Sequence, residues 1–517
     1  MKESKSHTFC FPFCEKSRRD FFRVSRVAAL AWLLAGCAPP VDSTLRFGLP
    51  TAPATLDPRF ATDANAARLC RLLYATLVDF DANFKPVPAL AHWDALTPTH
   101  YRFRLRRPAQ FHDGTPLTAT DVAATYRAVL DPLRGSPHRG SLAHLARVEV
   151  IDPATIDFHL SRADPLLPGL LVIGILRATD AARGRLGERP IGSGPFKLYA
   201  TPTSHRVPLE RIADGQRIDF IVVPNETTRA LKLARGELDL AQGGFAPELS
   251  LWLAQQPQIT VKQRAGTVFT YLGLNLVTGP TADARIRRAI ALAIDRGSLV
   301  QHVFKGQARL ANAILVPEHW AGYPGLPGVP FDPDAARRLL GAAGYSLAHP
   351  LRLSYKTSND HFRRRIAAIL QHQLHVVGIE LAIQTYDWGT FYGDIKQGRF
   401  ELYGLSWVGL QQPDIFRHAF HSAAVPPEGA NRGQYSNPIV DRLIEQAEVA
   451  PDEPSRAARY RQIQAILQAD LPYVPLWYED SLVVHGPRVL GYDTDLHGQF
   501  DGLININRVA TNVRPAP

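Results

Sequence analysis

The spacing of hydrophobic and polar residues changes repeatedly along the chain and predicts both strands and helices. Residues 101–105 alternate strictly between apolar and polar side chains, the pattern of a strand with one buried face. Residues 218–223 are mostly apolar, which is typical of parallel strands that are covered on both sides. Residues 283–295 place apolar side chains on one helical face and predict an amphipathic helix. The mixture indicates an α/β protein.

Start and stop signals set the bounds of several elements. Thr118-Ala119-Thr120-Asp121 is a capping box, and it predicts a helix that runs to about Leu130. Gly378 ends a helix predicted over residues 363–377, and a strand follows at 380–385. These signals are local, so we expect them to hold whatever the rest of the chain does.

Two strands are candidates for segments that cross between lobes, residues 270–276 and residues 473–478. Between residues 218 and 240 the pattern predicts a strand, a helix over 226–234 and a second short strand at 238–240. We interpret this block as a β-α-β unit in a parallel sheet. The Pro- and Gly-rich stretch 310–333 predicts a long surface loop.

The N-terminal residues 1–37 have the pattern of an export signal. Ser17–Arg23 carries paired arginines followed by Phe21-Phe22, as in twin-arginine signals, and Val27–Ala35 is apolar but too short to span a bilayer. Leu34-Ala35-Gly36-Cys37 is similar to a lipobox, so Cys37 would become the lipidated N-terminus of the mature protein. A soluble protein with a basic leader is the alternative.

Composition limits the remaining 480 residues to a protein of two or three packed lobes. The leader holds seven basic and three acidic residues, so a net charge of +6 remains of the total +10. These charges are scattered, and nucleic acid is therefore not an expected partner. Cys10 and Cys14 leave with the leader, which leaves Cys70 without a partner for a disulfide and makes packing the source of stability.

Motifs for catalysis, cofactors or metals are weak. Gly192-Ser193-Gly194 lacks the further glycine of a phosphate loop. His372 and His375 lie three apart on a predicted helix, without a third ligand nearby. His112-Asp113-Gly114 resembles an acid/base pair but sits in a predicted turn. We therefore expect no enzyme activity, no cofactor and no metal site.

A series of short motifs, in a consistent order, resembles one protein family. The motifs are Thr55-Leu56-Asp57-Pro58, Leu73-Tyr74, Pro88-Ala89-Leu90-Ala91, Phe111–Ala119, Ile191–Phe196, Ile286-Arg287-Arg288-Ala289, Ala293-Ile294-Asp295-Arg296, Asn431-Arg432 and Tyr435-Ser436-Asn437-Pro438. Together they identify the chain as similar to the extracellular solute-binding proteins of family 5, the peptide- and nickel-binding group of ABC importers. The resemblance covers essentially the whole chain after the leader.

The resemblance implies an α/β, two-lobed periplasmic-binding-protein-like fold of type II, with an extra subdomain in lobe I. The expected divisions are a signal peptide at 1–37, lobe I at 38–265 with the subdomain at about 75–180, lobe II at 266–479, and a return to lobe I at 480–517. It also implies a monomer, tethered outside the cytoplasmic membrane by its lipid, that passes a solute to ABC permease subunits. Closure of the lobes would bury the ligand.

In peptide-binding relatives a Trp is followed three residues later by an Asp that pairs with the α-amine of the peptide. Trp407 matches that Trp, but Leu410 stands at the position of the Asp. An aliphatic side chain cannot neutralise a buried ammonium. Asp414 is the candidate replacement in this loop, which includes Gly409, and the alternative is that Asp414 only caps the next helix.

Other candidate ligand residues are aromatic. Trp388 matches a second pocket Trp of these relatives, 19 residues before Trp407, and Tyr271 and Tyr478 lie on the two predicted crossing strands. Rings at a cleft supply apolar contact area with little loss of rotamer entropy. Core packing is the alternative for each of these residues.

Several functions remain open at this point. The first is capture of a peptide or peptide-like solute for an ABC permease. The second keeps the fold but takes a nickel chelate, an opine, haem or a sugar-like compound, and Leu410 is the residue that favours it. A periplasmic hydrolase would need a nucleophile beside a base, and no such pattern occurs. A sensor or chaperone with the same fold is the remaining alternative.

Overall fold

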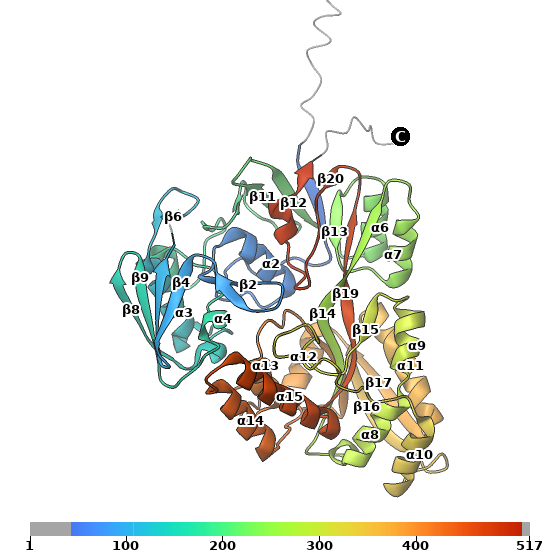
Figure 1. The fold of residues 1–517 in the computed structure, drawn as a ribbon. Coiled ribbons are helices and arrows are strands. Elements are labelled where there is room, and N and C mark those ends of the chain that lie inside the picture. Colours follow the sequence, from blue (N-terminus) through green and yellow to red (C-terminus); the bar gives the residue numbers. More distant parts are fainter. Residues whose placement is uncertain (1–42, 107, 509–517) are drawn as a thin grey trace, which may run out of the picture. The chain divides into compact units, whose positions relative to one another are not determined.

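A mixed sheet of eleven strands runs through the structure, a computed structural model that describes residues 43–106 and 108–508 (Figure 1). Its strands are β1 (Leu45–Leu49), β10 (Phe196–Leu198), β11 (Arg206–Arg211), β12 (Arg217–Val222), β13 (Leu240–Gln242), β14 (Thr260–Leu274), β15 (Ala308–Leu310), β16 (Leu351–Ser358), β17 (Ile379–Tyr386), β18 (Leu402–Trp407) and β19 (Tyr473–His485). The spatial order is β10-β11-β12-β1-β13-β19-β14-β18-β16-β17, and β15 pairs with β19.

The predicted parallel block forms the centre of the sheet's first half. β1 pairs in parallel with β12, with Leu45 opposite Ile218, and also in parallel with β13. The short strand at 238–240 was placed two residues too early, because β13 begins at Leu240. β11 pairs antiparallel with β12, and the edge strand β10 pairs antiparallel with β11, so the sheet is mixed and not wholly parallel.

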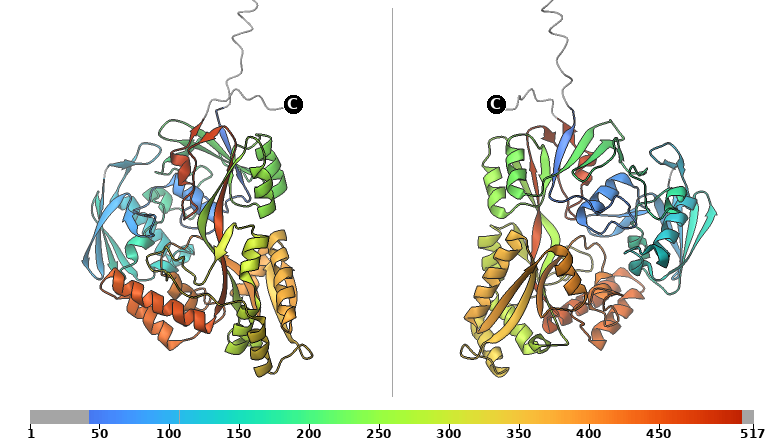
Figure 2. Two further views of the ribbon diagram at one scale, coloured as in Figure 1. Left: turned by 45° about the vertical axis from the view of Figure 1, so that its right-hand side comes forward. Right: turned by 180° about the vertical axis from the view of Figure 1, so that it is seen from behind.

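Strands β14 and β19 join the two halves of the sheet (Figures 1 and 2). They pair antiparallel over most of their length, with a register shift between Arg264 and Val268. Both strands are longer than predicted, because polar side chains at Thr260–Arg264 and at Glu479–Ser481 gave no strand period in the sequence. A pair of long shared strands is the kind of connection about which two lobes can rotate.

Smaller sheets complete the strand inventory. A four-stranded antiparallel sheet has the order β4-β5-β9-β8, and three pairs are β2-β3, β6-β7 and β20-β21. The bounds are β2 (Val78–Phe80), β3 (Pro86–Pro88), β4 (Ala91–Thr97), β5 (His100–Leu105), β6 (Ala109–Gln110), β7 (Pro116–Leu117), β8 (Leu145–Asp152), β9 (Thr155–Leu160), β20 (Val489–Leu490) and β21 (Asn507–Arg508). The strictly alternating segment 101–105 is part of β5, as predicted.

The α-helices are α2 (Ala64–Leu73), α3 (Ala119–Leu130), α4 (Leu167–Leu170), α5 (Ala178–Ala181), α6 (Glu226–Ala234), α7 (Pro247–Ala254), α8 (Ala284–Ala293), α9 (Arg296–Ser298), α10 (Pro333–Ala342), α11 (His361–Val376), α12 (Trp388–Lys396), α13 (Ile415–Phe420), α14 (Pro438–Glu448) and α15 (Glu453–Asp470). Single turns are η1 (Pro132–Arg134), η2 (Gly140–Leu142), η3 (Pro280–Ala282), η5 (Asp501–Ile504) and the π-helical η4 (Leu299–Val303). The capping box at the start of α3 is present, since the Thr118 N–H donates to Asp121 Oδ2 at 2.8 Å.

The glycine motif at 192–194 forms hydrogen bonds with the C-terminal end of α2. The amides of Ser193 and Gly194 donate to the carbonyl oxygen of Leu73 at 3.0 and 2.8 Å. A Cβ at Gly192 would lie 1.9 Å from that same oxygen, so only glycine permits the approach. These contacts lie at Leu73, the last residue of α2.

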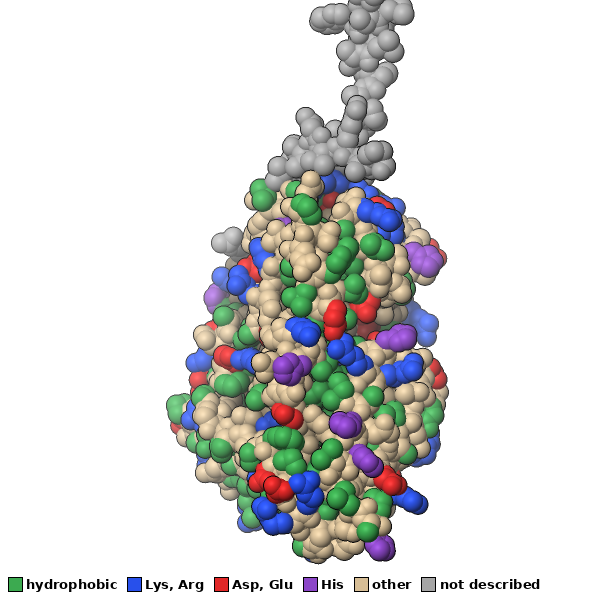
Figure 3. Space-filling model, turned by 90° about the vertical axis from the view of Figure 1, so that its right-hand side faces the viewer, with side chains coloured by type: hydrophobic (Ala, Val, Ile, Leu, Met, Phe, Trp, Pro, Cys, Tyr) green, Lys and Arg blue, Asp and Glu red, His purple; other side chains and the backbone are tan. Residues whose placement is uncertain are grey.

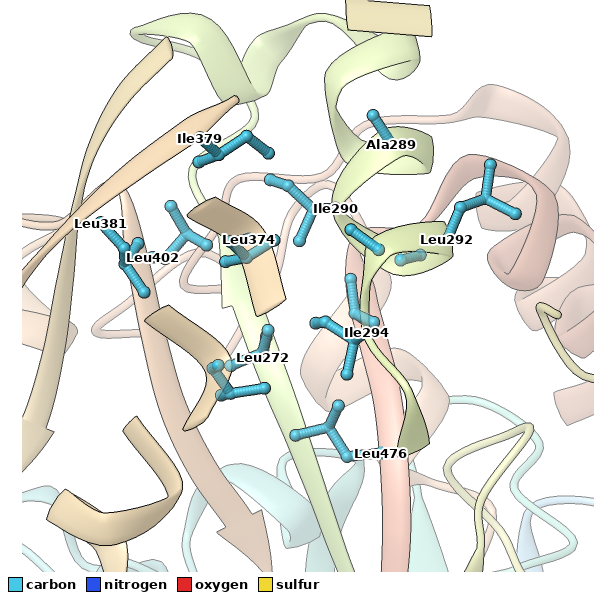
Figure 4. Packing of buried hydrophobic residues seen from close by; sticks show 14 of the residues in the cluster. Leu272, Ala289, Ile290, Leu292, Ile294, Leu374, Ile379, Leu381, Leu402 and Leu476 are labelled. Atoms are coloured by element: carbon cyan, nitrogen blue, oxygen red, sulfur yellow. The ribbon is translucent and has the colours of Figure 1, made fainter. Parts of the chain in front are cut away.

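Separate hydrophobic cores define two lobes. We use lobe I for the core around β1, β12 and β13, which includes C-terminal side chains such as Tyr492 and Phe500, together with the subdomain core around Phe103 and Phe158. We use lobe II for the cores around β14, β16 and α11 and around α13–α15. Figure 4 shows Leu374 and Ile290 packed near Leu272 in lobe II.

The surface carries mixed charges. On the face that includes α6, α7, α9 and α11, cationic, anionic, histidine and apolar side chains are interspersed (Figure 3). No continuous basic patch is visible on that face within the described residues. A nucleic-acid backbone would need such a patch. No described helix is long and apolar enough to cross a membrane.

Candidate functional site

A cavity of about 440 Å³ has walls from both lobes. Lobe I supplies α2, η2, α4 with the segment to Gly174, and residues 497–499. Lobe II supplies residues 408–412, which follow β18, and the start of α13. A volume of this size is near the lower end of the range for small-molecule sites. The cavity therefore suits a small ligand that both lobes contact.

A second hollow of about 600 Å³ is lined by lobe I alone, from His112 to Arg217. Two of its cations, Lys197 and Arg217, are already paired with Glu210, each at 3.1 Å. We therefore take the cavity between the lobes as the candidate site.

The lobe II wall is a loop that turns sharply after β18. Gly409 has φ of +72°, in the left-handed region, and no atom within 4 Å would obstruct a Cβ there. Glycine is therefore favoured at this position by the left-handed backbone conformation and not by a lack of space for a side chain. Gly409 and Leu410 both line the cavity.

Asp414 also lines the cavity, at the first residue before α13. Its side chain makes no capping hydrogen bond, although the residue occupies the N-cap position. Burial, and then the negative charge of Asp164, raise the pKa of Asp414 to about 7. A half-buried carboxyl group in this environment is poised to ionise when a cation enters.

Three further polar atoms on the cavity wall have no hydrogen-bond partner among the described residues: Gln412 Nε2, His138 Nε2 and His497 Nδ1. Gln412 is 6% exposed. Its Nε2 packs closely against Gly169 of lobe I, since a Cβ added at Gly169 would lie only 1.9 Å from that nitrogen. Buried polar groups normally have hydrogen-bond partners, so the absence of such partners within the described residues points to a ligand or water.

Trp407 lies behind this wall and is not part of the cavity lining. The Arg432 guanidinium lies 5.0 Å from the centre of its ring, and His418, which does line the cavity, contacts the ring edge-on at 6.0 Å. The Trp407 Nε1 is buried and has no hydrogen-bond partner in the part of the chain that the structure describes. Trp407 thus supports the cavity wall through His418.

Trp388 is the first residue of α12 and is 59% exposed. Its ring stacks on Tyr392 at 5.5 Å, and the Arg432 guanidinium lies 5.5 Å from the Tyr392 ring. Trp388 is therefore linked to Trp407 through a stack of side chains, but it does not line the cavity.

Tyr271 and Tyr478 are buried in β14 and β19, at 1% and 2% exposure. Tyr271 stacks on Tyr473 at 4.0 Å, and the Tyr478 hydroxyl lies 2.6 Å from the carbonyl oxygen of Ala313. Neither ring lines the cavity, and both pack within the lobe II core.

One group of described residues has metal-ligand chemistry: His100, Asp157 and His159 on β5 and β9. The Asp157 carboxylate already accepts two hydrogen bonds from Arg102, both at 2.8 Å, and these hydrogen bonds lower the pKa of Asp157 to about 2. A cation would have to displace that arginine. The group lies outside the cavity.

The N-terminal predictions, including lipidation at Cys37, concern residues 1–42, which lie outside the described residues. Cys70 is a buried free cysteine, and burial raises the pKa of its thiol well above the usual range. It therefore stays a thiol at neutral pH and acts as a small core residue.

Comparisons with known proteins agree with this architecture. The family model for bacterial extracellular solute-binding proteins, family 5 (middle), matches residues 83–425. The chain is similar to di/tripeptide-binding protein 2 of Pseudomonas aeruginosa strain UCBPP-PA14, with 28% identity across 90% of this chain and 94% of that protein.

Two solved structures resemble the chain over nearly their whole length. The periplasmic binding protein DppA of Helicobacter pylori in complex with the peptide STSA has a TM-score of 0.77 at 25% identity, covering 88% of this chain and 97% of that one. NikZ of Campylobacter jejuni in complex with Ni(L-His) has a TM-score of 0.80 at 21% identity, covering 90% and 99%. The predicted two-lobed periplasmic-binding-protein-like fold is confirmed.

Proposed function

The chain belongs to the bacterial extracellular solute-binding proteins of family 5, and from this premise we propose that it is the substrate-binding component of an ABC importer for short peptides or peptide-like solutes. It captures the solute outside the cytoplasmic membrane and delivers it to the permease. Its work is binding and release, without the making or breaking of bonds. Gln412 and Gly409, on the lobe II wall, close the cavity over the ligand.

The observation that carries this proposal is the Asp414 carboxyl group in the cavity wall. It has no capping hydrogen bond and a pKa raised to about 7 by burial, so it is an incompletely neutralised acid facing a space of ligand size. A peptide α-amine carries the complementary charge near neutral pH. Asp414 is thus the group that pairs with the amine, in place of the Asp that relatives have where Leu410 stands.

Location and assembly follow from the leader and the family. The lipobox cysteine Cys37 tethers the mature protein to the membrane, and the protein works as a monomer with its permease. Lobe I spans about 38–265 and 480–517, and lobe II spans about 266–479. The register shift between Arg264 and Val268 on β14 lies near the boundary of 265/266 and supplies the flexible point for closure.

A thermal-shift screen with free and N-acetylated di- to octapeptides tests this function. A ligand at 100 times its dissociation constant stabilises the folded protein by about 2.7 kcal/mol, which raises the Tm measurably. Free peptides should raise the Tm of the wild type, and acetylated peptides should not. Asp414→Asn should abolish the shift by free peptides, whereas Asp334→Asn, a change at an exposed aspartate on α10, should keep it.

A second candidate function keeps the fold and changes the ligand. Leu410 and Val408 line the cavity with aliphatic groups, which favours ligands without an amine at that point. The same screen therefore includes nickel-histidine, haem and opines. If one of these raises the Tm and no peptide does, peptide capture is the wrong function.

A further inference from the structure

The four-stranded sheet β4-β5-β9-β8 in the subdomain of lobe I has two faces of different character (Figure 1). Phe103 on β5 and Phe158 on β9 pack in the subdomain core, together with residues of α3 such as Tyr126. Because side chains alternate between the two faces of a strand, His100 on β5 and His159 on β9 lie on the opposite, outer face. The outer face therefore gathers polar side chains from neighbouring strands.

Two imidazole rings lie side by side on this outer face. His100 and His159 are directly opposite each other where β5 pairs with β9, and their ring centroids are 4.2 Å apart. The two side chains are only 24% and 25% exposed. One ring nitrogen of each histidine and one carboxylate oxygen of Asp157 lie within 4.8 Å of one another. Ring nitrogens of histidine are common ligands of zinc, and these two are close enough to share one ion after small rotations.

Glu149 on β8 can supply a third ligand. It is opposite Asp157 where β8 pairs with β9, and its Oε2 lies 3.2 Å from the Nε2 of His159. Asp157 is held by the two hydrogen bonds from Arg102. Glu149 instead pairs at 2.8 Å with Arg147, whose side chain is 61% exposed. Ion pairs between exposed side chains contribute little free energy, so a divalent cation can take the place of Arg147.

The hydrogen bonds show which ring nitrogens can offer a lone pair. Arg147 Nη2 lies 3.1 Å from His159 Nε2, and a guanidinium can only donate, so this Nε2 is an acceptor in that contact. His100 Nε2 lies 2.9 Å from Asp157 Oδ2, to which it donates. A metal at His100 requires the other tautomer, with the hydrogen on Nδ1. The hydrogen bonds between Asp157 and Arg102 remain in place.

We propose that His100, His159 and Glu149 form a zinc site on the outer face of the lobe I subdomain, with water as the fourth ligand. Two imidazoles and one carboxylate are a known ligand set of tetrahedral Zn²⁺, and bonds of about 2.0–2.2 Å place the ligand atoms about 3.3–3.5 Å apart. The 3.2 Å between His159 and Glu149 is already close to this spacing, so His100 is the ring that must turn. The site links β5, β9 and β8, and it is separate from the cavity between the lobes.

A zinc titration of the purified exported protein, stripped of metal and in competition with a chromogenic chelator, tests this site. The wild type should bind zinc, and its Tm should rise with Zn²⁺ but not with Mg²⁺, which prefers oxygen ligands. His100→Gln and His159→Gln should each weaken zinc binding by more than about 10-fold, since loss of even an outer partner of a ligand costs that much. His92→Gln, at an exposed histidine of β4, should bind zinc as the wild type does.

Arg147→Gln tests the role of Glu149 by a gain of affinity, which a damaged fold would not produce. It removes the cation that competes for Glu149 and for His159 Nε2, so zinc should bind more tightly, whereas Glu149→Gln should weaken zinc binding. Unchanged affinity in both variants would overturn a site that spans three strands. The proposal is also wrong if the wild type binds no zinc, or if the double variant His100→Gln/His159→Gln binds it as the wild type does, because the metal then lies elsewhere.

Discussion

At the scale of single residues, the cavity wall holds polar groups that are desolvated without an ion pair among the described residues. Asp414 has a raised pKa and no capping hydrogen bond, and Gln412 Nε2 has no acceptor within residues 43–106 and 108–508. Buried groups of this kind lower the stability of the ligand-free protein. A solute-binding protein can recover that cost when the ligand arrives, so stability and affinity are coupled at these residues.

Asp414→Asn should stabilise the ligand-free protein in a pH-dependent manner. Below the ordinary pKa of 3.8 the Asp414 carboxyl is neutral in both the folded and the unfolded state, and the substitution changes little. Between pH 4 and pH 7 the unfolded chain ionises while the folded one stays protonated, which costs the wild type up to about 1.4 kcal/mol per pH unit. Above pH 7 the penalty is constant.

Thermal unfolding from pH 4 to pH 8 measures this difference. The gain in Tm of Asp414→Asn over the wild type should grow up to about pH 7 and then level off. Asp334→Asn, at an exposed position, should show no such trend. A gain that is independent of pH would mean that the pKa of Asp414 is the same in the folded and the unfolded protein, so that burial does not raise it.

At the scale of elements, the β2–β3 hairpin reaches from lobe I into lobe II. Phe84, near its tip, has φ of +62° and is fully buried in the lobe II core. Its ring lies 4.8 Å from that of His319 and 4.5 Å from that of His497, and the neighbouring Lys85 pairs with Glu453 on α15 at 2.9 Å. A left-handed conformation costs a bulky residue about 1–2 kcal/mol, so burial of the ring must offset it.

The hairpin also contacts the ligand loop through His319. Burial lowers the pKa of His319 to about 4, so its ring is neutral, and its Nε2 lies 3.2 Å from the carbonyl oxygen of Gln411, to which it donates. Phe84 thus packs on the side chain that holds the lobe II wall of the cavity. The hairpin therefore connects lobe I to the side chain that contacts the cavity wall of lobe II.

Phe84→Ala should weaken ligand binding at least about 10-fold, because the contact between the lobes loses a buried ring. Removal of a Phe ring from a core costs about 3–5 kcal/mol. Each lobe keeps its own core, so the protein should stay folded with a smaller loss of stability than a core Phe→Ala change causes. Calorimetric affinity and Tm, measured together, check both statements. Leu133→Ala, at a 95% exposed position of η1, is the control.

At the scale of the whole molecule, contacts between the lobes surround the cavity. Besides Phe84 and Lys85, Arg162 of lobe I pairs with Glu448 of lobe II at 3.0 Å, and Gln412 packs on Gly169. β14 and β19 are the strands that join the lobes within the described sheet. We expect a ligand that contacts both walls of the cavity to favour this arrangement of the lobes.

Small-angle scattering should therefore show a larger radius of gyration for the ligand-free protein than for the peptide-saturated one. The physical reason is that a bound ligand interacts with both walls of the cavity. These interactions stabilise the closed form and increase its population. Phe84→Ala should enlarge the ligand-free form further. Identical radii with and without a bound peptide would contradict closure on binding.

Local patterns determined much of this protein without tertiary information. The capping box at Thr118, the helix stop at Gly378 and the alternation at 101–105 depend on neighbours in the sequence, so they predict α3, α11 and β5 closely. The family motifs, which occur throughout the chain, indicated the two-lobed fold. The loop with Gly409 and Asp414 was also identified from the sequence, by its match to the family around Trp407.

Only the tertiary structure decided which side chains share the cavity. Arg68, His138, Gln412 and His497 come from segments far apart in the chain, and no local period marks a polar residue that has lost its partners. The polar face of α2 is the one sequence signal that could have drawn attention to Arg68. Likewise the burial of Phe84 depends on the core of lobe II, to which no neighbouring residue in the sequence belongs. These contacts depend on packing between segments that are distant in the sequence, because the burial of a side chain and its hydrogen-bond partners are determined only in the folded protein.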